Sequence, residues 1–533
     1  MSPTVSISEA LDEAPLGLFH FRAVVTAGVG FFADAYDLFI IGPALVLIEE
    51  SWHPSSSSVS LLGATSLFAA FFGAVLFGRL ADIVGRKRIY GIEAAVMVIG
   101  SLASALAPNM GWLLVARFVL GVGIGGDYPV SAVLAAEFAN RSNRGRLVGS
   151  VFSMQAAGLI AGPVVALTLL GAGVQHDLLW RIMLGVGAAP AAMVIYRRRK
   201  MPESPRFVAK VRGQWEQAAR DVATFSSGEL SVAGLSDVSS KRLGLRAFLT
   251  DRRYVRTLVG TAGTWFLVDY AYYGNTISTP RILQIVDHSV SLTSSLAWTL
   301  IIFLVAALPG YMLAVQLMDR IGHRLIQVGG FLAMGVTFFA IGAFHGVIAI
   351  PGLFLIVYGV SYFFTEFGPN MSTFVLSAEL YPVSMRTTGD GISAGVGKLG
   401  AFAGVLTFPV LTTMFGLRGT LLVSAGVCVA GAALTFVLPE PARRSLEEVA
   451  EDPSESEQAM APFVLLRQER ANRERAEMLA NSASVFAGSL EAEQVLELLT
   501  VQARVGLRCE QTVVILIGED KVASIYTRGI QDT

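Results

Sequence analysis

Long apolar segments follow one another along most of this 533-residue chain. An α-helix needs roughly 17–25 mostly apolar residues to cross the hydrocarbon core of a bilayer, and these segments reach that length. They fall into two sets of six, with a long polar stretch between the sets. The first set covers 22–48, 58–81, 89–107, 111–138, 147–171 and 178–196, and the second covers 256–281, 291–317, 325–343, 349–378, 387–413 and 417–438. The pattern predicts an all-α polytopic membrane protein with twelve transmembrane helices in two six-helix halves.

The charge content agrees with a membrane protein and excludes other classes. Only 15% of the residues are charged, whereas soluble globular chains carry about 25%. Two cysteines, Cys428 and Cys509, are too few for a disulfide framework or a Cys-x-x-Cys metal site. We expect no metal and no other cofactor. Residues 1–17 are polar and acidic and lack the basic region of a signal peptide, so we expect no removable leader.

Basic residues gather in alternate loops, and cytoplasmic loops are the ones that carry an excess of Lys and Arg. One side has Arg86 with its neighbours and the run Arg197–Lys200, while the other has little beyond Arg281 and Arg418. We therefore place both termini in the cytoplasm and the chain in the cell (plasma or inner) membrane. The expected parts are a cytoplasmic N-terminal segment (1–19), an N-terminal bundle (20–197), a central cytoplasmic loop (198–255), a C-terminal bundle (256–440) and a cytoplasmic tail (441–533).

The two halves repeat short motifs at corresponding places. GRLADIVGRKR at 78–88 is echoed by LMDRIGHR at 317–324, and an acid and an arginine seven residues apart close the fourth and the tenth spans. A duplicated six-helix unit is typical of secondary transporters, whose site lies between the repeats. The motifs predict ion pairs that close the cytoplasmic ends of the halves: Asp82 with Arg86, Asp319 with Arg320 or Arg324, Glu137 with Arg144, and Glu379 with Arg386. The alternative is that these basic loops serve topology alone.

The fourth span contains a glycine-rich run, GVGIGG, followed directly by Asp127 and Tyr128. Small residues let membrane helices approach closely, whereas a charged side chain at mid-membrane costs about 2.5–3.5 kcal/mol on insertion scales. We therefore expect Asp127 and Tyr128 to face a transport pathway, with a buried structural pair as the alternative. A nucleotide-binding loop is disfavoured, because no strand precedes the glycines and no P-loop lysine follows them.

Six motifs together resemble one family. They are FFADAYDLF at 31–39, YGIE at 90–93, GVGIGGDYPVSA at 121–132, TAGTWFLVDYAYYG at 261–274, EFGPN at 366–370 and GISAGVGKLGA at 391–401. The combination resembles the phosphate:proton symporters of the major facilitator superfamily over roughly residues 20–440, so it implies the major facilitator fold. PESPR at 202–206 and SLEE at 445–448 resemble the wider sugar-porter branch.

The resemblance implies roles for individual residues. In that family, phosphate is held by residues that match Tyr128, Gln155, Trp265, Asp269, Tyr273, Asn370 and Lys398, and proton movement is associated with positions that match Asp34, Asp37, Glu93, Arg117 and Asp127. The chain departs from the family pattern at Gly42, where an asparagine is usual, and at Asp390, where a histidine is usual.

The chemistry of these residues supports an anion site. Trp265, Asp269 and Tyr273 are spaced by four and share one face of a helix. Lys398 is a lone cation in its span, and serves either as a ligand or as a structural ion-pair partner. The surrounding hydroxyl, amide and indole donors suit an oxyanion. A carboxylate at Asp269 repels an anion unless one of the two carries a proton, so substrate binding and protonation should favour each other.

After Pro439 the chain becomes charged and helix-prone, with RQERANRERAEMLA, an amphipathic SLEAEQVLELL and two strand-like segments, TVVILIG and KVASIYTRG. We expect a soluble cytoplasmic tail that forms a small, partial sensor-like α/β module and offers a site for a cytoplasmic regulator. A largely unstructured tail with one helix is the alternative.

The leading hypothesis is a proton-coupled importer of inorganic phosphate that works by alternating access. One alternative is proton symport of another small organic anion or a sugar, and a second is a ligand-sensing receptor with a transporter-like body. We expect neither an enzyme nor a nucleic-acid-binding protein; the expected partners are phosphate, protons and the lipid bilayer.

Overall fold

The computed structural model describes residues 7–225, 243–287, 289–450, 512–517 and 522–528. The chain divides into two units, Met1–Ala450 and Glu451–Thr533. In the second unit the structure describes one antiparallel pair of strands, β1 (Thr512–Ile517) and β2 (Val522–Arg528). They fall on the two strand-like segments of the tail. The helices predicted in the tail lie outside the described residues.

Among the described residues, nine segments of the first unit are long and apolar enough to cross a membrane. Six of them lie in the first half and overlap the six spans predicted there. They are Leu18–Trp52, formed by α2 (Leu18–Phe39) and α3 (Ile41–Trp52); Ser56–Val84, which is α4; Arg86–Ala105, formed by α5 (Arg86–Ile89) and α6 (Ile92–Ala105); Met110–Phe138, which is α7; Arg144–Gly171, formed by α8 (Arg144–Ser153) and α9 (Gln155–Gly171); and His176–Lys200, formed by α10 (His176–Val186) and α11 (Ala188–Lys200).

The other three such segments lie in the second half. They are Leu292–Ile321, formed by α16 (Leu292–Ile302), the π-helical turn η1 (Phe303–Ala307) and α17 (Leu308–Ile321); His323–Ala343, which is α18; and Arg386–Thr435, which is α22. Gly416 has a left-handed φ of 68° and divides α22 between two predicted spans. The remaining predicted spans, 256–281 and 349–378, fall on α15 (Arg252–Val286) and on α20 (Pro351–Phe367) with α21 (Pro369–Glu379). These helices are outside the nine because α15 is rich in polar residues and α20 is interrupted after Phe367, at Gly368.

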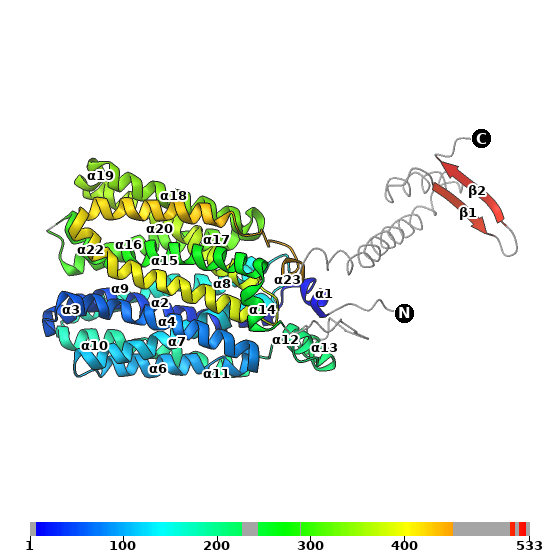
Figure 1. Ribbon diagram of the computed structural model, residues 1–533, viewed down its shortest axis with the longest axis horizontal. Coiled ribbons are helices and arrows are strands. Elements are labelled where there is room, and N and C mark those ends of the chain that lie inside the picture. Colours follow the sequence, from blue (N-terminus) through cyan, green and yellow to red (C-terminus); the bar gives the residue numbers. More distant parts are fainter. Residues whose placement is uncertain (1–6, 226–242, 288, 451–511, 518–521, 529–533) are drawn as a thin grey trace. The chain divides into compact units, whose positions relative to one another are not determined.

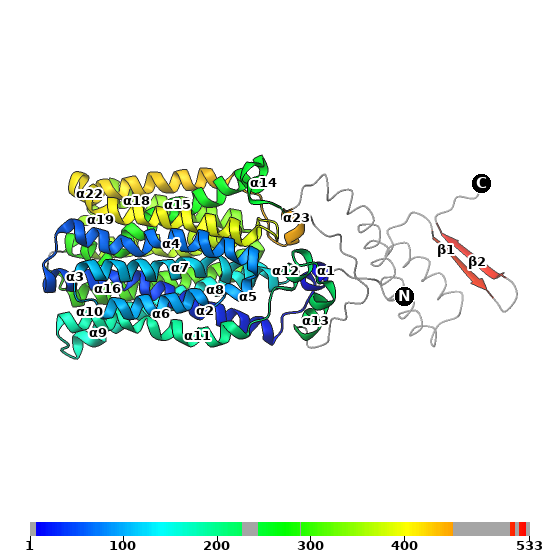
Figure 2. The same ribbon diagram turned by 60° about the horizontal axis from the view of Figure 1, so that its bottom comes forward.

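The two halves form two layers of roughly parallel helices. In Figure 1 the blue and cyan helices of the first half lie below the green and yellow helices of the second, and Figure 2 shows the same bundle turned. Short helices extend one end of the bundle, which we call the α12 end: α1 (Ile7–Asp12), α12 (Pro205–Lys210), α13 (Trp215–Phe225), α14 (Leu245–Thr250) and α23 (Leu446–Ala450). The opposite end carries α3 and α19 (His345–Ala349), and we call it the α19 end.

The glycine-rich run of α7 packs directly on α4. A Cβ added at Gly121 would overlap the carbonyl of Ser66, and one at Gly125 would overlap the carbonyl of Ala70. Only glycine permits this approach of backbone to backbone, which is how small residues stabilise contacts between membrane helices. The glycines therefore fix the interior of the first half, while Tyr128, on the same helix, points to the centre of the molecule.

The first unit continues past the predicted end of the C-terminal bundle at residue 440. Helix α23 packs there, because Val449 joins Leu376, Leu380 and Leu438 in one apolar cluster. The residues up to Ala450 therefore belong to the helical body and not to the tail.

Candidate substrate site and gates between the two halves

The seven predicted phosphate ligands come from both halves and are buried, each at most 3% exposed. They are Tyr128 on α7, Gln155 on α9, Trp265, Asp269 and Tyr273 on α15, Asn370 on α21 and Lys398 on α22. They form two hydrogen-bonded groups, one around Lys398 and one around Gln155, and Tyr128 belongs to both.

Lys398 is the centre of the first group. Its Nζ lies 3.0 Å from Oδ2 of Asp269 and donates a hydrogen bond of 2.9 Å to the hydroxyl of Tyr273. The same ammonium lies 4.4 Å from the ring centroid of Tyr128, which belongs to the other half. A buried ammonium needs such partners, because desolvation of an unpaired charge costs several kcal/mol. A lone lysine in an apolar span needs a counter-charge, and in the structure Asp269, one of the predicted ligands, provides it for Lys398.

The second group links the halves through uncharged donors. The amide of Gln155 donates 2.9 Å to the hydroxyl of Tyr128, and Tyr311 on α17 donates 3.2 Å to Oε1 of Gln155. Asn370 donates 3.0 Å to the hydroxyl of Tyr311 and 2.5 Å to Oε2 of Glu366, which lies on α20. The chain of bonds ends at that carboxylate, so the site contains a second acid besides Asp269.

Sequence reasoning missed both Tyr311 and Glu366. Glu366 was visible as an acid inside an apolar run, in the motif EFGPN, but no role was attached to it. Tyr311 is a single tyrosine in an apolar segment, and nothing in the sequence marks it.

Aromatic rings pack around these polar residues. The ring of Trp265 lies 6.1 Å from that of Tyr128 and 6.3 Å from that of Phe374, measured between centroids. A Cβ at Gly397 would overlap the Trp265 indole, so this glycine makes the space that the indole fills. The rings contribute faces that attract cations and edges that exclude water, and they keep Lys398 in a dry environment.

Asp127 turns away from the central cluster into the first half. Oδ2 of Asp127 lies 2.7 Å from Nη2 of Arg198, whose Nη1 lies 3.1 Å from Glu93, and the guanidinium stacks 4.5 Å from the centroid of Tyr90. Consecutive residues of a helix point about 100° apart, so Asp127 and its neighbour Tyr128 contact different partners. The contacts of Asp127 are those of a buried structural pair, whereas Tyr128 contacts residues of both halves. That Tyr128 faces a transport pathway stays a prediction.

Asp127, Glu93 and Arg198 form a buried group that we call the acid cluster. The sequence did not mark Arg198 as a member of it. It was counted with the basic run Arg197–Lys200 that marks the cytoplasmic side, yet its side chain is fully buried. Its neighbours Arg197 and Arg199 are exposed. A run of four basic residues on one helix must place some of them inward, but the run does not indicate which.

The other residues associated with proton movement also lie inside the first half. Asp37 accepts a 3.0 Å hydrogen bond from Ser101, and Arg117 donates 2.9 Å to the backbone carbonyl of Asp37. Asp34 is fully buried, and neither carboxylate oxygen has a hydrogen-bond partner among the described residues. Its charged neighbours include Asp127 and Lys398, so it lies between the acid cluster and the central site.

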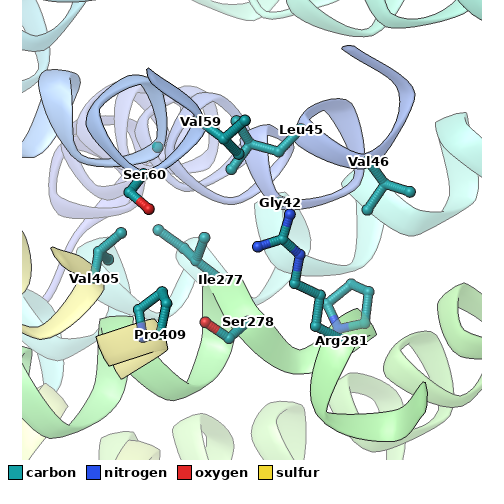
Figure 3. Close-up of a pocket in the computed structure, with 12 residues that line it drawn as sticks. Gly42, Leu45, Val46, Val59, Ser60, Ile277, Ser278, Arg281, Val405 and Pro409 are labelled. Atoms are coloured by element: carbon teal, nitrogen blue, oxygen red, sulfur yellow. The ribbon is translucent and has the colours of Figure 1, made fainter. Parts of the chain in front are cut away.

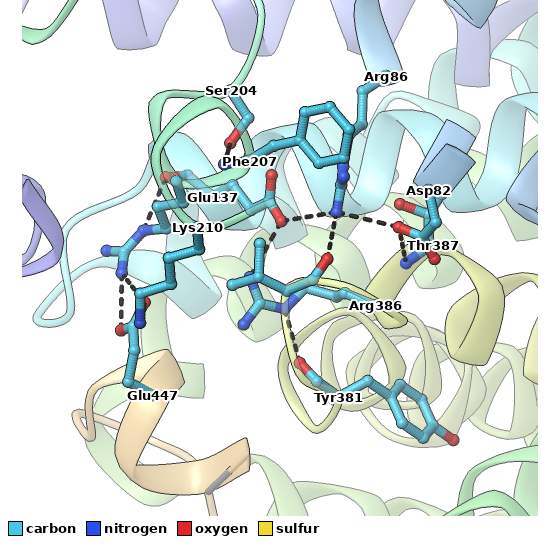
Figure 4. A network of polar contacts seen from close by, with 12 residues as sticks. Asp82, Arg86, Glu137, Ser204, Phe207, Lys210, Tyr381, Arg386, Thr387 and Glu447 are labelled. Atoms are coloured by element: carbon cyan, nitrogen blue, oxygen red, sulfur yellow. Dashed lines mark hydrogen bonds and ion pairs between the residues drawn. The ribbon is translucent and has the colours of Figure 1, made fainter. Parts of the chain in front are cut away.

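Ion pairs close the α12 end, and they cross between the halves (Figure 4). Arg386 lies 3.0 Å from Glu137, and Arg86 bridges the same glutamate at 3.2 Å and Asp82 at 3.1 Å. We call this network, together with the pair Arg144–Glu379 at 3.3 Å, the gate. The predicted pair of Asp82 with Arg86 is present. The other two acids exchange partners relative to the prediction, because each arginine begins a helix that faces the other half.

Asp319 does not pair with Arg320 or Arg324. Its carboxylate accepts hydrogen bonds of 2.9 and 2.7 Å from the backbone N–H groups of Gly145 and Arg146, in the first turn of α8. Arg320 is exposed, and the guanidinium of Arg324 lies 5.2 Å from the ring centroid of Phe436. The first-turn amides of a helix are unsatisfied within the helix and attract a carboxylate, so Asp319 binds the other half by capping it.

A further network joins α23 to the rest of the α12 end. Arg206 contacts Glu447 at 2.8 Å and Asp12 at 2.6 Å. Lys210 lies 3.3 Å from Glu447 (Figure 4). We call these contacts of Glu447 the latch. Burial by itself would raise the pKa of Glu447, but the surrounding cations, Arg206 first, hold that pKa well below its ordinary value. Glu447 therefore stays ionised, and can keep its ion pairs, throughout the neutral and mildly acidic pH range.

The α19 end is also bridged. Arg281 of α15 forms an ion pair with Glu49 of α3 in the other half. Beside it lies a pocket lined by residues of both halves, including Gly42, Ile277 and Pro409 (Figure 3). A Cβ at Gly42 would lie 2.9 Å from the carbonyl oxygen of Ile277, so the departure from the family's asparagine coincides with close contact between the halves.

Asp390, the second departure, is fully buried on α22, with Asp82 among its neighbours. Among the described residues, no group of three or more His, Cys, Asp or Glu side chains is placed to hold a metal ion.

The chain is similar to known transporters along most of its length. A model of the family described as "Sugar (and other) transporter" matches residues 23–452. A "Probable inorganic phosphate transporter 1-6" of Arabidopsis thaliana is 35% identical over 84% of this chain and 96% of its own. An "Inorganic phosphate transporter 1-6" of Oryza sativa subsp. japonica is 36% identical over 86% of this chain and 97% of its own.

Solved structures share the fold. The major facilitator proton:xylose symporter XylE, bound to 6-bromo-6-deoxy-D-glucose, matches with a TM-score of 0.66 and 19% identity, over 81% of this chain and 98% of its own. A double tryptophan variant of XylE matches with a TM-score of 0.69 and 20% identity, over 81% and 98%. At this identity the likeness establishes the major facilitator fold alone.

Proposed function

Because the chain belongs to the sugar (and other) transporter family of the major facilitator superfamily, we propose that it is a proton-coupled transporter that imports inorganic phosphate by alternating access. The family is one of transporters and not of enzymes. The relatives that carry the name of inorganic phosphate transporters support phosphate as the substrate. Coupling to protons is our inference from the site.

The observation that carries the proposal is the setting of Lys398. One ammonium lies between the halves, close to Asp269, Tyr273 and the ring of Tyr128. Gln155 and Asn370 add amide donors from the two sides. A cation ringed by uncharged donors is suited to a small oxyanion, and a neutral sugar would leave the ammonium without a counter-charge other than Asp269.

Asp269 supplies the coupling. In the structure it neutralises Lys398. A phosphate that binds Lys398 competes with this carboxylate, and the competition is relieved when Asp269 takes a proton. Proton and phosphate therefore bind together and leave together, which is the thermodynamic requirement for symport. Asp34, which neighbours both Lys398 and Asp127, offers a route from this point to the acid cluster of Asp127, Arg198 and Glu93.

The proposal includes the arrangement in the membrane. We take the nine apolar segments together with α15, the pair α20–α21 and the second part of α22 as twelve spans in two pseudo-symmetric halves. The basic residues of the α12 end place that end, both termini and the central loop in the cytoplasm, with the chain in the plasma or inner membrane. Residues 451–533 form a cytoplasmic tail of sensor-like α/β type to which a regulator binds.

Uptake by proteoliposomes tests the function. Purified protein is reconstituted, a pH gradient is imposed with the interior alkaline, and labelled phosphate is followed. We expect accumulation that a protonophore abolishes and that unlabelled phosphate competes with, while xylose does not compete. Accumulation of an organic anion or a sugar but not of phosphate would replace the substrate. Phosphate binding without counterflow would favour the receptor.

A further inference from the structure

We infer that Glu366 determines which oxyanions the site accepts, by receiving a hydrogen bond from a hydroxyl of the bound anion and so excluding anions that have none. The inference rests on the proposed function, since it concerns the specificity of the same site. It assigns hydrogen phosphate and arsenate as ligands and sulfate as the anion that is rejected.

Glu366 lies at the opposite end of the hydrogen-bonded chain from Lys398. Its Oε2 accepts 2.5 Å from Asn370, a predicted phosphate ligand, and Asn370 in turn contacts Tyr311. Glu366 is fully buried, and its second oxygen, Oε1, has no hydrogen-bond partner among the described residues. A buried acceptor without a donor is costly, and each case in a native structure asks for an explanation. A donor brought by the substrate is such an explanation.

The surroundings of Glu366 contain polar but no cationic neighbours among the described residues. The hydroxyls of Tyr272 and Tyr311 interact with its carboxyl group, and the charge of Asp269 acts on it. No ion pair of Glu366 is present in the described part of the chain, in contrast to Asp269, which has Lys398. An anion between Lys398 and Asn370 therefore has a cation on one side and an uncompensated acid on the other.

The two acids Asp269 and Glu366, together with the ammonium of Lys398, distinguish oxyanions by whether the anion carries a proton. At neutral pH phosphate and arsenate retain at least one hydroxyl, which donates to a carboxylate, whereas sulfate has only acceptor oxygens. Sulfate would place an acceptor oxygen against the acceptor oxygen of Glu366 and would leave both without a donor, which penalises binding. The preference for phosphate then comes from the exclusion of sulfate by Glu366 as much as from the attraction of phosphate by Lys398.

The test compares anions in Glu366→Gln. Glutamine keeps the size of the side chain and a carbonyl oxygen for Asn370, so it preserves the local scaffold while it removes the charge. Dissociation constants of inorganic phosphate, arsenate and sulfate are measured by competition against labelled phosphate with the full chain in lipid nanodiscs. In the native protein we expect phosphate and arsenate to bind at least about tenfold more tightly than sulfate. In Glu366→Gln that ratio should fall towards one, chiefly because sulfate binds better.

Glu366→Asp is the matched control, since it retains a carboxylate on the same helix and should retain the preference for phosphate. Equal weakening of phosphate and sulfate in Glu366→Gln would make Glu366 a structural residue and overturn the inference. So would a native protein that binds both anions equally. Native protein that binds no phosphate at all would instead overturn the proposed function, so the two failures are distinguishable.

Discussion

Asp82 and Asp319 occupy equivalent places in the two halves, and each caps a helix of the opposite half. Asp319 accepts from the first turn of α8, as described above, and Asp82 accepts 2.6 Å from the backbone N–H and 2.7 Å from the hydroxyl of Thr388, in the first turn of α22. A carboxylate bound to the amides at a helix N-terminus has both hydrogen bonds and the helix dipole in its favour. The two aspartates therefore hold the halves together symmetrically at the α12 end.

Removal of these caps should open the cytoplasmic side. Asp319→Ala should cost about 0.5–2 kcal/mol of the closed state. Asp82→Ala should cost more, because it also removes an ion-pair partner of buried Arg86, and in both variants the cytoplasm-open population should rise. Distances between spin labels on the cytoplasmic ends of α4 and α22 measure it. Asp251→Ala is the control, because Asp251 caps α15 within its own half; an equal shift in that variant would contradict the assignment.

Reversal of one ion pair should reveal that the gate crosses the halves. Arg144→Glu and Glu379→Arg each leave buried like charges, where loss of one partner of a buried pair costs about 3–5 kcal/mol, so transport should fall sharply in both. The double variant restores an attractive pair and should recover part of the transport rate in proteoliposomes. The exposed pair Glu216–Arg220 on α13 is the control, and its reversal should change little. No recovery in the double variant would count against the pairing.

Lys398→Ala should abolish phosphate binding in protein that still folds and inserts. Lys398 neutralises Asp269, so the single variant also buries an unpaired acid, and Lys398→Met with Asp269→Asn removes both charges and protects the fold. Neither variant should bind phosphate by calorimetry, whereas Lys200→Ala, which changes an exposed lysine at the end of α11, should bind normally. Native affinity in either site variant would show that Lys398 is not a ligand.

Asp269→Asn should separate binding from the proton. Asparagine keeps the size of the side chain and donates through its amide, like a protonated acid that never releases its proton. Phosphate binding should become less dependent on pH, and exchange should persist while uphill uptake is lost. Asp269 and the bound phosphate are coupled closely enough to titrate together, so the apparent pKa of binding belongs to the site as a whole. Full gradient-driven accumulation in Asp269→Asn would move the coupling role to Asp34, Asp37 or Asp127.

The tail should be dispensable from residue 451 onward but not from residue 441. Truncation after Ala450 keeps the latch, in which Glu447 binds Arg206 and Lys210, and uptake per molecule in the membrane should stay native. Truncation after Glu440 removes α23 and should lower both thermal stability and uptake, as should Glu447→Gln to a smaller degree. Loss of uptake in the longer truncate, at unchanged membrane abundance, would instead support a receptor or a tail-regulated transporter.

The sequence was sufficient for the framework of the fold. Apolar length located the six long apolar segments of the first half and the three of the second that the structure describes, because a helix must cross a bilayer of known thickness, and the motif repeat located the acids and arginines of the gate. The sequence did not reveal which acid of the gate pairs with which arginine. Glu137 and Arg144 are close in sequence, yet Glu137 contacts Arg386 and Arg144 contacts Glu379, because contacts between halves depend on how two helix layers meet and not on spacing along one of them.

The candidate site, too, was predictable only in part from the sequence. The predicted ligands lie in two neighbouring groups, one around Lys398 and one around Gln155, but the direction of a side chain on its helix decides what it touches. Asp127 follows Gly126 and precedes Tyr128, and a rotation of about 100° is enough to give it Arg198 instead of the central cluster. Glu366 had no expected role because a single acid in an apolar run does not reveal its neighbours, and Asn370 and Tyr311 reach it from two other helices.

The contact of α7 with α4 through Gly121 and Gly125 has an evolutionary consequence. Since any side chain there would strike the carbonyls of Ser66 and Ala70, the interior of the first half can hardly be altered one residue at a time. A change in what the site binds is therefore easier to make at the residues of the two hydrogen-bonded groups, such as Tyr128 and Gln155, than at these two glycines, which hold α7 against α4.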